Sequence, residues 1–157
     1  MDLFEKPLYF FQLNLISFLL SIIGLSEALN LAYENMNEHR KKIISLKKHM
    51  IKSLAKKVRG VKFNGLSSDI EKSLYTVLNV SIPNIEDQQM FLFNLDINNI
   101  AASAGSACSS GSDSGSHVLK EIKTEKGFVN VRFSFSKYNS LEEVDYVSNK
   151  IVEIINL

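Results

Sequence analysis

The spacing of hydrophobic residues first predicts a long helix. Between residues 25 and 58 apolar side chains recur every three or four positions, the period of one helix face. They are Leu25, Leu29, Ala32, Met36, Ile43, Leu46, Met50, Leu54 and Val58. Gly60 follows the last of them and suits the glycine that often ends a helix. The pattern therefore predicts one continuous amphipathic helix over residues 25–58.

Two later stretches alternate between apolar and polar residues, as half-buried strands do. The first is residues 76–82, which Pro83 closes, and the second is residues 129–136. Shorter strands are predicted at residues 61–63 and 100–103. We therefore expect a small sheet in which one face is apolar and the other is polar.

Helices are predicted between and after these strands. Asn84 can cap one of them, with Glu86 and Asp87 in its first turn and Met90, Phe91 and Leu95 in its body. A short helix is predicted at residues 117–123. Ser140 and Glu143 form a capping-box pattern that opens a last helix, with Val144, Val147, Ile151 and Ile154 on one side. The order of elements predicts an α/β chain, in detail an α+β small domain whose small sheet is covered by helices and preceded by a long helix.

The N-terminal stretch lies outside this pattern. From Pro7 to Ser26 there are 20 residues without a charge, which is long enough to cross a bilayer. Polar side chains such as Gln12 and Asn14 interrupt the run, and two acidic residues precede it, which fits a signal peptide badly. We expect a helical lead-in here, and a membrane-anchored helix over residues 7–26 is the alternative.

Composition and charge narrow the classes of function. With 157 residues, 45% of them hydrophobic, the chain can bury one core. A single cysteine excludes a disulfide framework and a cysteine-based zinc site, and we expect no metal. Net charge is +1, but residues 40–59 hold nine basic side chains and no acidic one. Because this run has few arginines and no interleaved aromatics, it favours a solvated face or an acidic partner over nucleic acid.

The cysteine is the first candidate for chemistry. Cys108 lies within residues 103–116, where ten of fourteen residues are serine or glycine. A structural cysteine usually lies among apolar residues, whereas a thiol in a glycine-rich loop can be carried to a substrate. Such a segment also suits a linker. His117 is nine residues further on, but no orienting asparagine or oxyanion hole marks a cysteine protease.

Arg132 is the second candidate. It lies in the middle of the predicted strand 129–136, at a position that alternation places on the polar face. A guanidinium held on a rigid strand can clamp a carboxylate through two hydrogen bonds. An ordinary surface arginine paired with an acidic side chain is equally consistent with the pattern. His39 interrupts the apolar stripe of the long helix and is interpreted as a packed or rim histidine rather than a ligand.

Both candidates lie in segments that resemble one enzyme family. Residues 103–111, Ser-Ala-Gly-Ser-Ala-Cys-Ser-Ser-Gly, with Ser-His-Val-Leu at 116–119, are similar to the active-site cysteine loop of the cysteine desulfurases. Residues 131–147 are similar to the closing strand and helix of these class V aminotransferase family enzymes. Shorter matches at residues 22–29 and 78–81 come in the same order. The resemblance runs from about Ile22 to Leu157.

The resemblance implies a fold and an activity. It implies the C-terminal small domain of a fold-type I transferase that depends on pyridoxal 5'-phosphate. It implies conversion of L-cysteine to L-alanine, with Cys108 attacking the substrate sulfur and keeping it as a persulfide. Arg132 matches the arginine that binds the substrate carboxylate. The sulfur would pass to an iron–sulfur scaffold or another acceptor protein, for cluster assembly or tRNA thiolation. Full-length family members are implied to be homodimers, and a cytoplasmic location is expected.

The front of the chain departs from the family. Residues 1–21 are expected to be an apolar lead-in that does not match, and residues 22–157 the C-terminal domain of a cysteine desulfurase. No lysine stands in the context of the family's cofactor lysine, since Lys47-Lys48-His49 reverses the expected order. We expect a truncated or split form that needs a missing large domain or a desulfurase partner chain. A stand-alone persulfide carrier and a membrane-anchored interaction protein are the alternatives.

Overall fold

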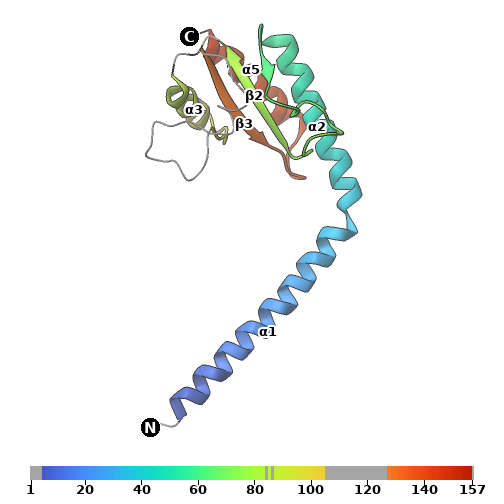
Figure 1. The fold of residues 1–157 in the computed structure, drawn as a ribbon, viewed down its shortest axis with the longest axis vertical. Coiled ribbons are helices and arrows are strands. Elements are labelled where there is room, and N and C mark those ends of the chain that lie inside the picture. Colours follow the sequence, from blue (N-terminus) through green and yellow to red (C-terminus); the bar gives the residue numbers. More distant parts are fainter. Residues whose placement is uncertain (1–4, 84, 86, 105–126, 157) are drawn as a thin grey trace. The chain divides into compact units, whose positions relative to one another are not determined.

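A computed structural model describes residues 5–83, 85, 87–104 and 127–156 (Figure 1). Its helices and strands are, in order, α1 (Glu5–Glu34), α2 (Met36–Lys57), β1 (Lys62–Phe63), β2 (Val77–Pro83), α3 (Gln88–Ile97), β3 (Phe128–Ser134) and α5 (Leu141–Ile155). The chain divides into two compact units, Met1–Glu38 and His39–Leu157. The predicted helix at residues 117–123 lies outside the described residues.

The prediction of one continuous helix over residues 25–58 was wrong. The chain leaves helical geometry at Asn35, so that α1 and α2 are separate helices. Asparagine is a weak helix former because its side chain competes for backbone hydrogen bonds. The apolar stripe also changes in burial along its length: Leu25 is 71% exposed, whereas Leu46 is 2% exposed. Only the part of the stripe from Ile43 to Val58 packs against a core.

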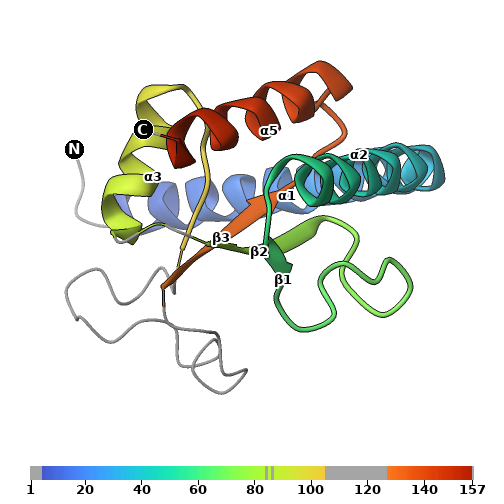
Figure 2. The same ribbon diagram turned by 90° about the horizontal axis from the view of Figure 1, so that it is seen from above.

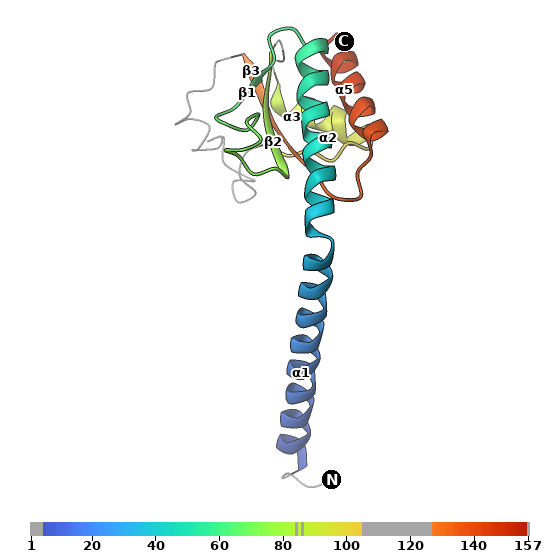
Figure 3. The same ribbon diagram turned by 90° about the vertical axis from the view of Figure 1, so that its right-hand side faces the viewer.

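The three strands form one antiparallel sheet in the order β1-β2-β3. Strand β2 pairs with β3 along its whole length, with Val80 opposite Val131 and Asn79 opposite Arg132. Their alternation was predicted, and it sends Leu78, Val80, Ile82, Val129, Val131 and Phe133 into the core. Helices α2, α3 and α5 cover this apolar face of the sheet (Figures 2 and 3).

The predicted strand at residues 100–103 is reduced to a single bridge between Ser103 and Arg132. The reason lies in how α3 ends. The amide of Ile100 donates to the carbonyl of Leu95 at 2.9 Å, which commits it to the helix end. Asn99, with φ of 58°, turns the chain out of the helix. Only at Ser103 does this segment reach hydrogen-bonding distance of β3.

Helix α3 begins three residues later than the predicted cap implies. Asp87, not Asn84, is the N-cap, and its carboxylate accepts hydrogen bonds from the amides of Gln89 at 2.7 Å and Met90 at 3.1 Å. A carboxylate there also complements the positive end of the helix dipole. The helix contains Met90, Phe91 and Leu95, as predicted; Phe91 and Leu95 are buried, while Met90 is 56% exposed.

One lysine of the basic run is buried in the core. Lys47 in α2 has no exposed surface, and its Nζ donates to Ser73 Oγ at 2.9 Å and to the carbonyl of Leu74 at 3.0 Å. Burial lowers the pKa of Lys47 below its ordinary 10.5, and nearby Asp69 opposes that shift. The interpretation of the run as a solvated face is therefore wrong at this one position, because the side chain lies on the packed side of α2.

The predicted capping box of α5 is confirmed. Glu143 N donates to Ser140 Oγ at 3.2 Å, and Ser140 N donates to Glu143 Oε2 at 3.1 Å. Asn139 Nδ2 donates to the same carboxylate oxygen at 3.0 Å. Hydrogen bonds from the Asn139 side chain and the Ser140 backbone lower the pKa of Glu143. The last helix thus begins at a fixed point directly after β3.

We predict that Ser140→Ala destabilises the protein by about 1 kcal/mol, because an amide at the start of α5 loses its acceptor. Urea unfolding of the full chain measures the change. Ser45→Ala, at an exposed position inside α2, is the matched control and should leave stability unchanged or slightly raised. Equal midpoints for Ser140→Ala and the natural protein would show that the cap contributes nothing.

The second prediction concerns Lys47 and pH. Because the folded state lowers the pKa of this lysine, the unfolded chain binds its proton more tightly than the folded chain does. The penalty is full below the lowered pKa and is relieved as pH rises toward 10.5. Lys47→Met should therefore remove part of the rise in stability between about pH 7 and about pH 10.

Urea unfolding at several pH values between these limits tests that prediction. Lys48→Met, at the exposed neighbouring position, is the matched control and should keep the dependence of the natural protein. An unchanged pH dependence in Lys47→Met would contradict the assignment of this lysine as a buried, charge-penalised group.

Candidate functional site

Arg132 is the candidate site residue that the structure describes. Its side chain is exposed while those of Val131 and Phe133 are buried, as the alternation predicted. Its backbone is held on both sides, since Asn79 of β2 lies opposite it and Ser103 bridges it on the other edge of β3. The side chain therefore extends from a point of the sheet that is paired on both edges.

The bridge from Ser103 consists of two hydrogen bonds. Arg132 N donates to Ser103 O at 2.7 Å, and Ser103 N donates to Arg132 O at 3.2 Å. Ser103 is also where the serine- and glycine-rich segment begins. The structure thus ties the start of that segment to the residue predicted to bind a carboxylate. Cys108 itself, like His117, lies outside the described residues.

A polar network on the same face of the sheet was not predicted. Asn64 Nδ2 donates to Asn79 Oδ1 and to Asn130 Oδ1, both at 2.8 Å. Ser81 Oγ donates to Asn64 Oδ1 at 2.8 Å and also contacts Asn130 Oδ1. Ser81 and Asn130 are 3% and 8% exposed, so their polar atoms need these partners. The network joins the turn after β1 to both strands and orders the backbone on which Arg132 lies.

The signal for this network was present in the sequence. Asn79, Ser81 and Asn130 all occupy polar positions of the two alternating strands, on the face that carries Arg132. Short amides and hydroxyls at successive positions of one face can bond to one another, whereas long charged side chains would extend into solvent. The alternation predicted which face of the sheet these side chains occupy. Only the folded structure shows that Asn64, in the turn after β1, also belongs to the network.

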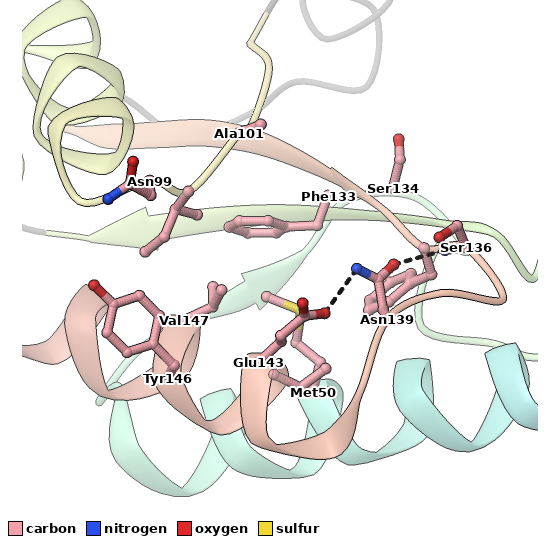
Figure 4. A pocket seen from close by; sticks show the side chains of 13 residues that line it. Met50, Asn99, Ala101, Phe133, Ser134, Ser136, Asn139, Glu143, Tyr146 and Val147 are labelled. Atoms are coloured by element: carbon pink, nitrogen blue, oxygen red, sulfur yellow. Dashed lines mark hydrogen bonds between the residues drawn. The ribbon is translucent and has the colours of Figure 1, made fainter.

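A hollow of about 480 Å³ lies between the C-terminal end of β3 and α5 (Figure 4). Its apolar lining includes Phe133 and Val147. Its rim carries Glu143 and Asn139, which are hydrogen bonded to each other, and Asn139 Oδ1 accepts from Ser136 N at 2.8 Å. Arg132 does not line it. The rim polar groups are thus used in starting α5, and the hollow is not part of the Arg132 face.

The histidines that the structure describes have local roles. His39 is half-buried, as expected of a packed or rim side chain. His49 Nε2 lies 2.8 Å from Asp145 Oδ1, which links α2 to α5. Across residues 5–83, 85, 87–104 and 127–156, no three histidine, cysteine, aspartate or glutamate side chains group as metal ligands would.

Three of the described lysines are engaged in ways that do not suit a lysine that binds pyridoxal 5'-phosphate. A cofactor lysine needs a free amine that faces an open site. Lys47 is buried with its amine bound to Ser73 and Leu74. Lys42 donates to the carbonyl of Lys137, and Lys57 donates to Asn149 Oδ1, both on the exposed surface. None of these three lysines therefore presents a free amine inside a cavity.

Comparison with known proteins shows the family. The family model "Aminotransferase class-V" matches residues 18–147. A "Cysteine desulfurase IscS" of Clostridium botulinum is 37% identical over 136 residues, which cover 85% of this chain and 34% of that protein. A "Cysteine desulfurase IscS" of Ehrlichia chaffeensis is 33% identical over 135 residues, 85% of this chain and 32% of that protein. The chain thus spans about a third of the length of these relatives.

Solved structures agree with the sequence comparison. A "NIFS-LIKE PROTEIN" superimposes with a TM-score of 0.67 and 28% identity, over 86% of this chain and 33% of that one. A NifS-like protein from Rickettsia africae superimposes with a TM-score of 0.64 and 26% identity. The superposition covers 81% of this chain and 32% of that one. Because the family model covers most of the sequence, the chain belongs to the class V aminotransferases, a family of pyridoxal-phosphate enzymes, within which it is similar to the cysteine desulfurases.

Proposed function

We propose that this chain supplies the sulfur-accepting thiol and the carboxylate-binding arginine of a cysteine desulfurase. The substrate is L-cysteine, the products are L-alanine and a persulfide on Cys108, and Arg132 binds the substrate carboxylate. The observation that carries the proposal is the pair of hydrogen bonds between Ser103 and Arg132. It links the segment that contains the nucleophile to the strand that contains the arginine.

Chain length limits how far the thiol can be from the arginine. Cys108 follows Ser103 by five residues, and five extended residues span at most about 18 Å. Ser103 is bonded to Arg132, so the tether starts at the carboxylate-binding position. A substrate held there by its carboxylate is within reach of this tether.

The chemistry of sulfur acceptance follows from the two side chains. The Cys108 thiolate attacks the sulfur of the bound cysteine, an S–S bond forms, and the bond between that sulfur and the substrate β-carbon breaks. The carbon takes the electron pair and a proton and leaves as alanine. Pyridoxal phosphate, held by the lysine-bearing part of a desulfurase, supplies the electron sink for this cleavage. The guanidinium fixes the carboxylate so that the sulfur is oriented toward the thiol.

The partners follow from the same proposal. The persulfide sulfur passes to an iron–sulfur scaffold or another acceptor protein in the cytoplasm, for cluster assembly or tRNA thiolation. The cofactor comes from a large domain or from a desulfurase chain, and complete family members would form homodimers. A second candidate is a persulfide carrier that receives sulfur already removed from cysteine. It is favoured by the engagement of Lys47 with Ser73 and Leu74.

We predict that Cys108 gains one sulfur atom when the chain is mixed with a complete cysteine desulfurase and L-cysteine. Intact-protein and peptide mass spectrometry measure the added sulfur and locate it. With L-cysteine and pyridoxal phosphate but no desulfurase, the chain should release no alanine, because no lysine of the sequence stands in the context of the family's cofactor lysine.

Two variants control the sulfur-transfer experiment. Cys108→Ser should gain no sulfur. Adding Ser45→Cys to that variant places a thiol at an exposed position of α2, and this thiol should gain several-fold less sulfur than Cys108. Equal labelling of the two thiols would mean that sulfur reaches any exposed cysteine, and the proposal would be wrong. Alanine release by the chain without desulfurase would refute the need for a lysine-bearing partner.

We also predict that Arg132→Gln weakens carboxylate binding about tenfold or more, because one charge-assisted bidentate contact is lost. Titration with L-alanine, followed through the amide NMR signals of Ser103 and Arg132, measures the affinity. Arg132→Lys should restore only part of it, since an ammonium cannot form the two-pronged contact. Arg59→Gln, at another exposed arginine, should not change it. Equal shifts with ethylamine, which has no carboxylate, would contradict the role of Arg132.

A further inference from the structure

An asparagine of β2 lies beside the arginine proposed to bind the substrate carboxylate. Asn79 is directly opposite Arg132 in the antiparallel pair of β2 and β3. Opposite residues of such a pair project to the same face, with their Cβ atoms about 5 Å apart. We propose that Asn79 is a second residue of the carboxylate site, and that its side-chain amide donates to the carboxylate that Arg132 binds. This inference rests on the proposed function, because it adds a second donor to the role given there to Arg132.

The amide of Asn79 has an unused donor. Its Oδ1 accepts a hydrogen bond from Asn64 Nδ2 at 2.8 Å. Among the residues that the structure describes, nothing accepts a hydrogen bond from Asn79 Nδ2. In the same residues no buried side-chain nitrogen or oxygen lacks a partner, so this nitrogen is open to solvent. Asn79 as a whole is half-buried. A molecule bound on this face therefore has access to its two N–H groups.

The polar network fixes the direction of this donor. Asn64 Nδ2 can only donate, so it pairs with the oxygen of the Asn79 amide and not with its nitrogen. The same Asn64 nitrogen donates to Asn130 Oδ1 at 2.8 Å, and Asn64 Oδ1 accepts from Ser81 Oγ at 2.8 Å. Both ends of the Asn64 amide are thus engaged. Half a turn of the Asn79 amide would bring two donors together, and its N–H groups therefore point away from Asn64.

The backbone of Asn79 is held as firmly as its side chain. The carbonyl of Asn79 accepts from the amide of Asn64 at 3.0 Å and from Ser67 Oγ at 2.8 Å. On its other side β2 pairs with β3. A donor that is already in place loses little freedom when it binds a ligand, which favours affinity.

The neighbouring asparagine does not suit the same role. Asn130 also lies on this face, but it is opposite Ser81, one residue pair further from Arg132 along the face. It is only 8% exposed. The half-buried amide that is directly opposite the exposed arginine is that of Asn79.

The chemistry of the pair fits a carboxylate. A carboxylate has about four sites that accept hydrogen bonds, and a bidentate guanidinium uses two of them. A neutral amide can use a third without adding a second positive charge. Neither β2 nor β3 contains an acidic residue, and within the described part of the chain no carboxylate forms an ion pair with Arg132. Both donors are therefore available to a ligand.

The test follows side-chain NMR signals of the full chain during titration with L-alanine. The N–H protons of the Asn79 amide and the Nε–H proton of Arg132 should shift together, with one dissociation constant. Ethylamine, which has no carboxylate, should shift neither signal. Because the natural protein is measured, this readout does not depend on the folding of a variant.

A pair of variants measures what the amide contributes. Asn79→Ala should raise the dissociation constant for L-alanine about tenfold, as expected for the loss of one hydrogen bond to a charged group. Asn149→Ala removes an amide from an exposed position of α5 and should leave the constant unchanged.

Two outcomes separate this inference from the proposed function. If the Arg132 signal shifts with L-alanine but the Asn79 amide does not, the donor serves another contact. The inference then falls while the proposed role of Arg132 stands. If the Arg132 signal does not shift, the proposed carboxylate site is itself wrong, and the inference falls with it.

Discussion

The pairing of β3 on both of its edges is the constraint on which the rest of the structure depends. On one edge seven residues of β2 pair with it in register. On the other, Ser103 adds two hydrogen bonds at Arg132. Strand β3 is thus a central strand at the one residue where its side chain carries proposed chemistry, and its backbone cannot shift without breaking bonds on both sides. The sheet thus fixes the backbone position from which the guanidinium extends.

The two roles proposed above make different demands on the backbone. An arginine that binds a carboxylate gains from a rigid backbone, because the planar guanidinium then loses little conformational freedom on binding. A thiol that must meet first a substrate and then an acceptor protein gains from a tether whose end can move. Placing the start of the tether at Ser103, bonded to the arginine strand, meets both demands with one short segment. The polar network of Asn64, Asn79 and Asn130 strengthens the rigid half of the arrangement.

Much of the fold could be predicted because it is encoded locally. The alternation of β2 and β3 and the capping box at Ser140 each depend on residues close together in the chain. The errors arose where distant contacts decide. Nothing near Lys47 in sequence shows that Ser73 and Leu74 will accept its hydrogen bonds. The strand predicted at residues 100–103 failed because the end of α3 uses the amide of Ile100. At the site, alternation gave the exposure of Arg132, whereas its bridge to Ser103 needed the fold.

The burial of Lys47 also bears on how the chemistry is divided. A lysine amine that forms a Schiff base with a cofactor aldehyde must be accessible, and a lowered pKa makes it more reactive. Lys47 has the lowered pKa but not the freedom, because both of its acceptors hold it inside the core. The lowered pKa of Lys47 is thus a result of packing. A shifted pKa alone does not identify a catalytic group. The proposed function therefore depends on Arg132, whose side chain is exposed, and not on Lys47.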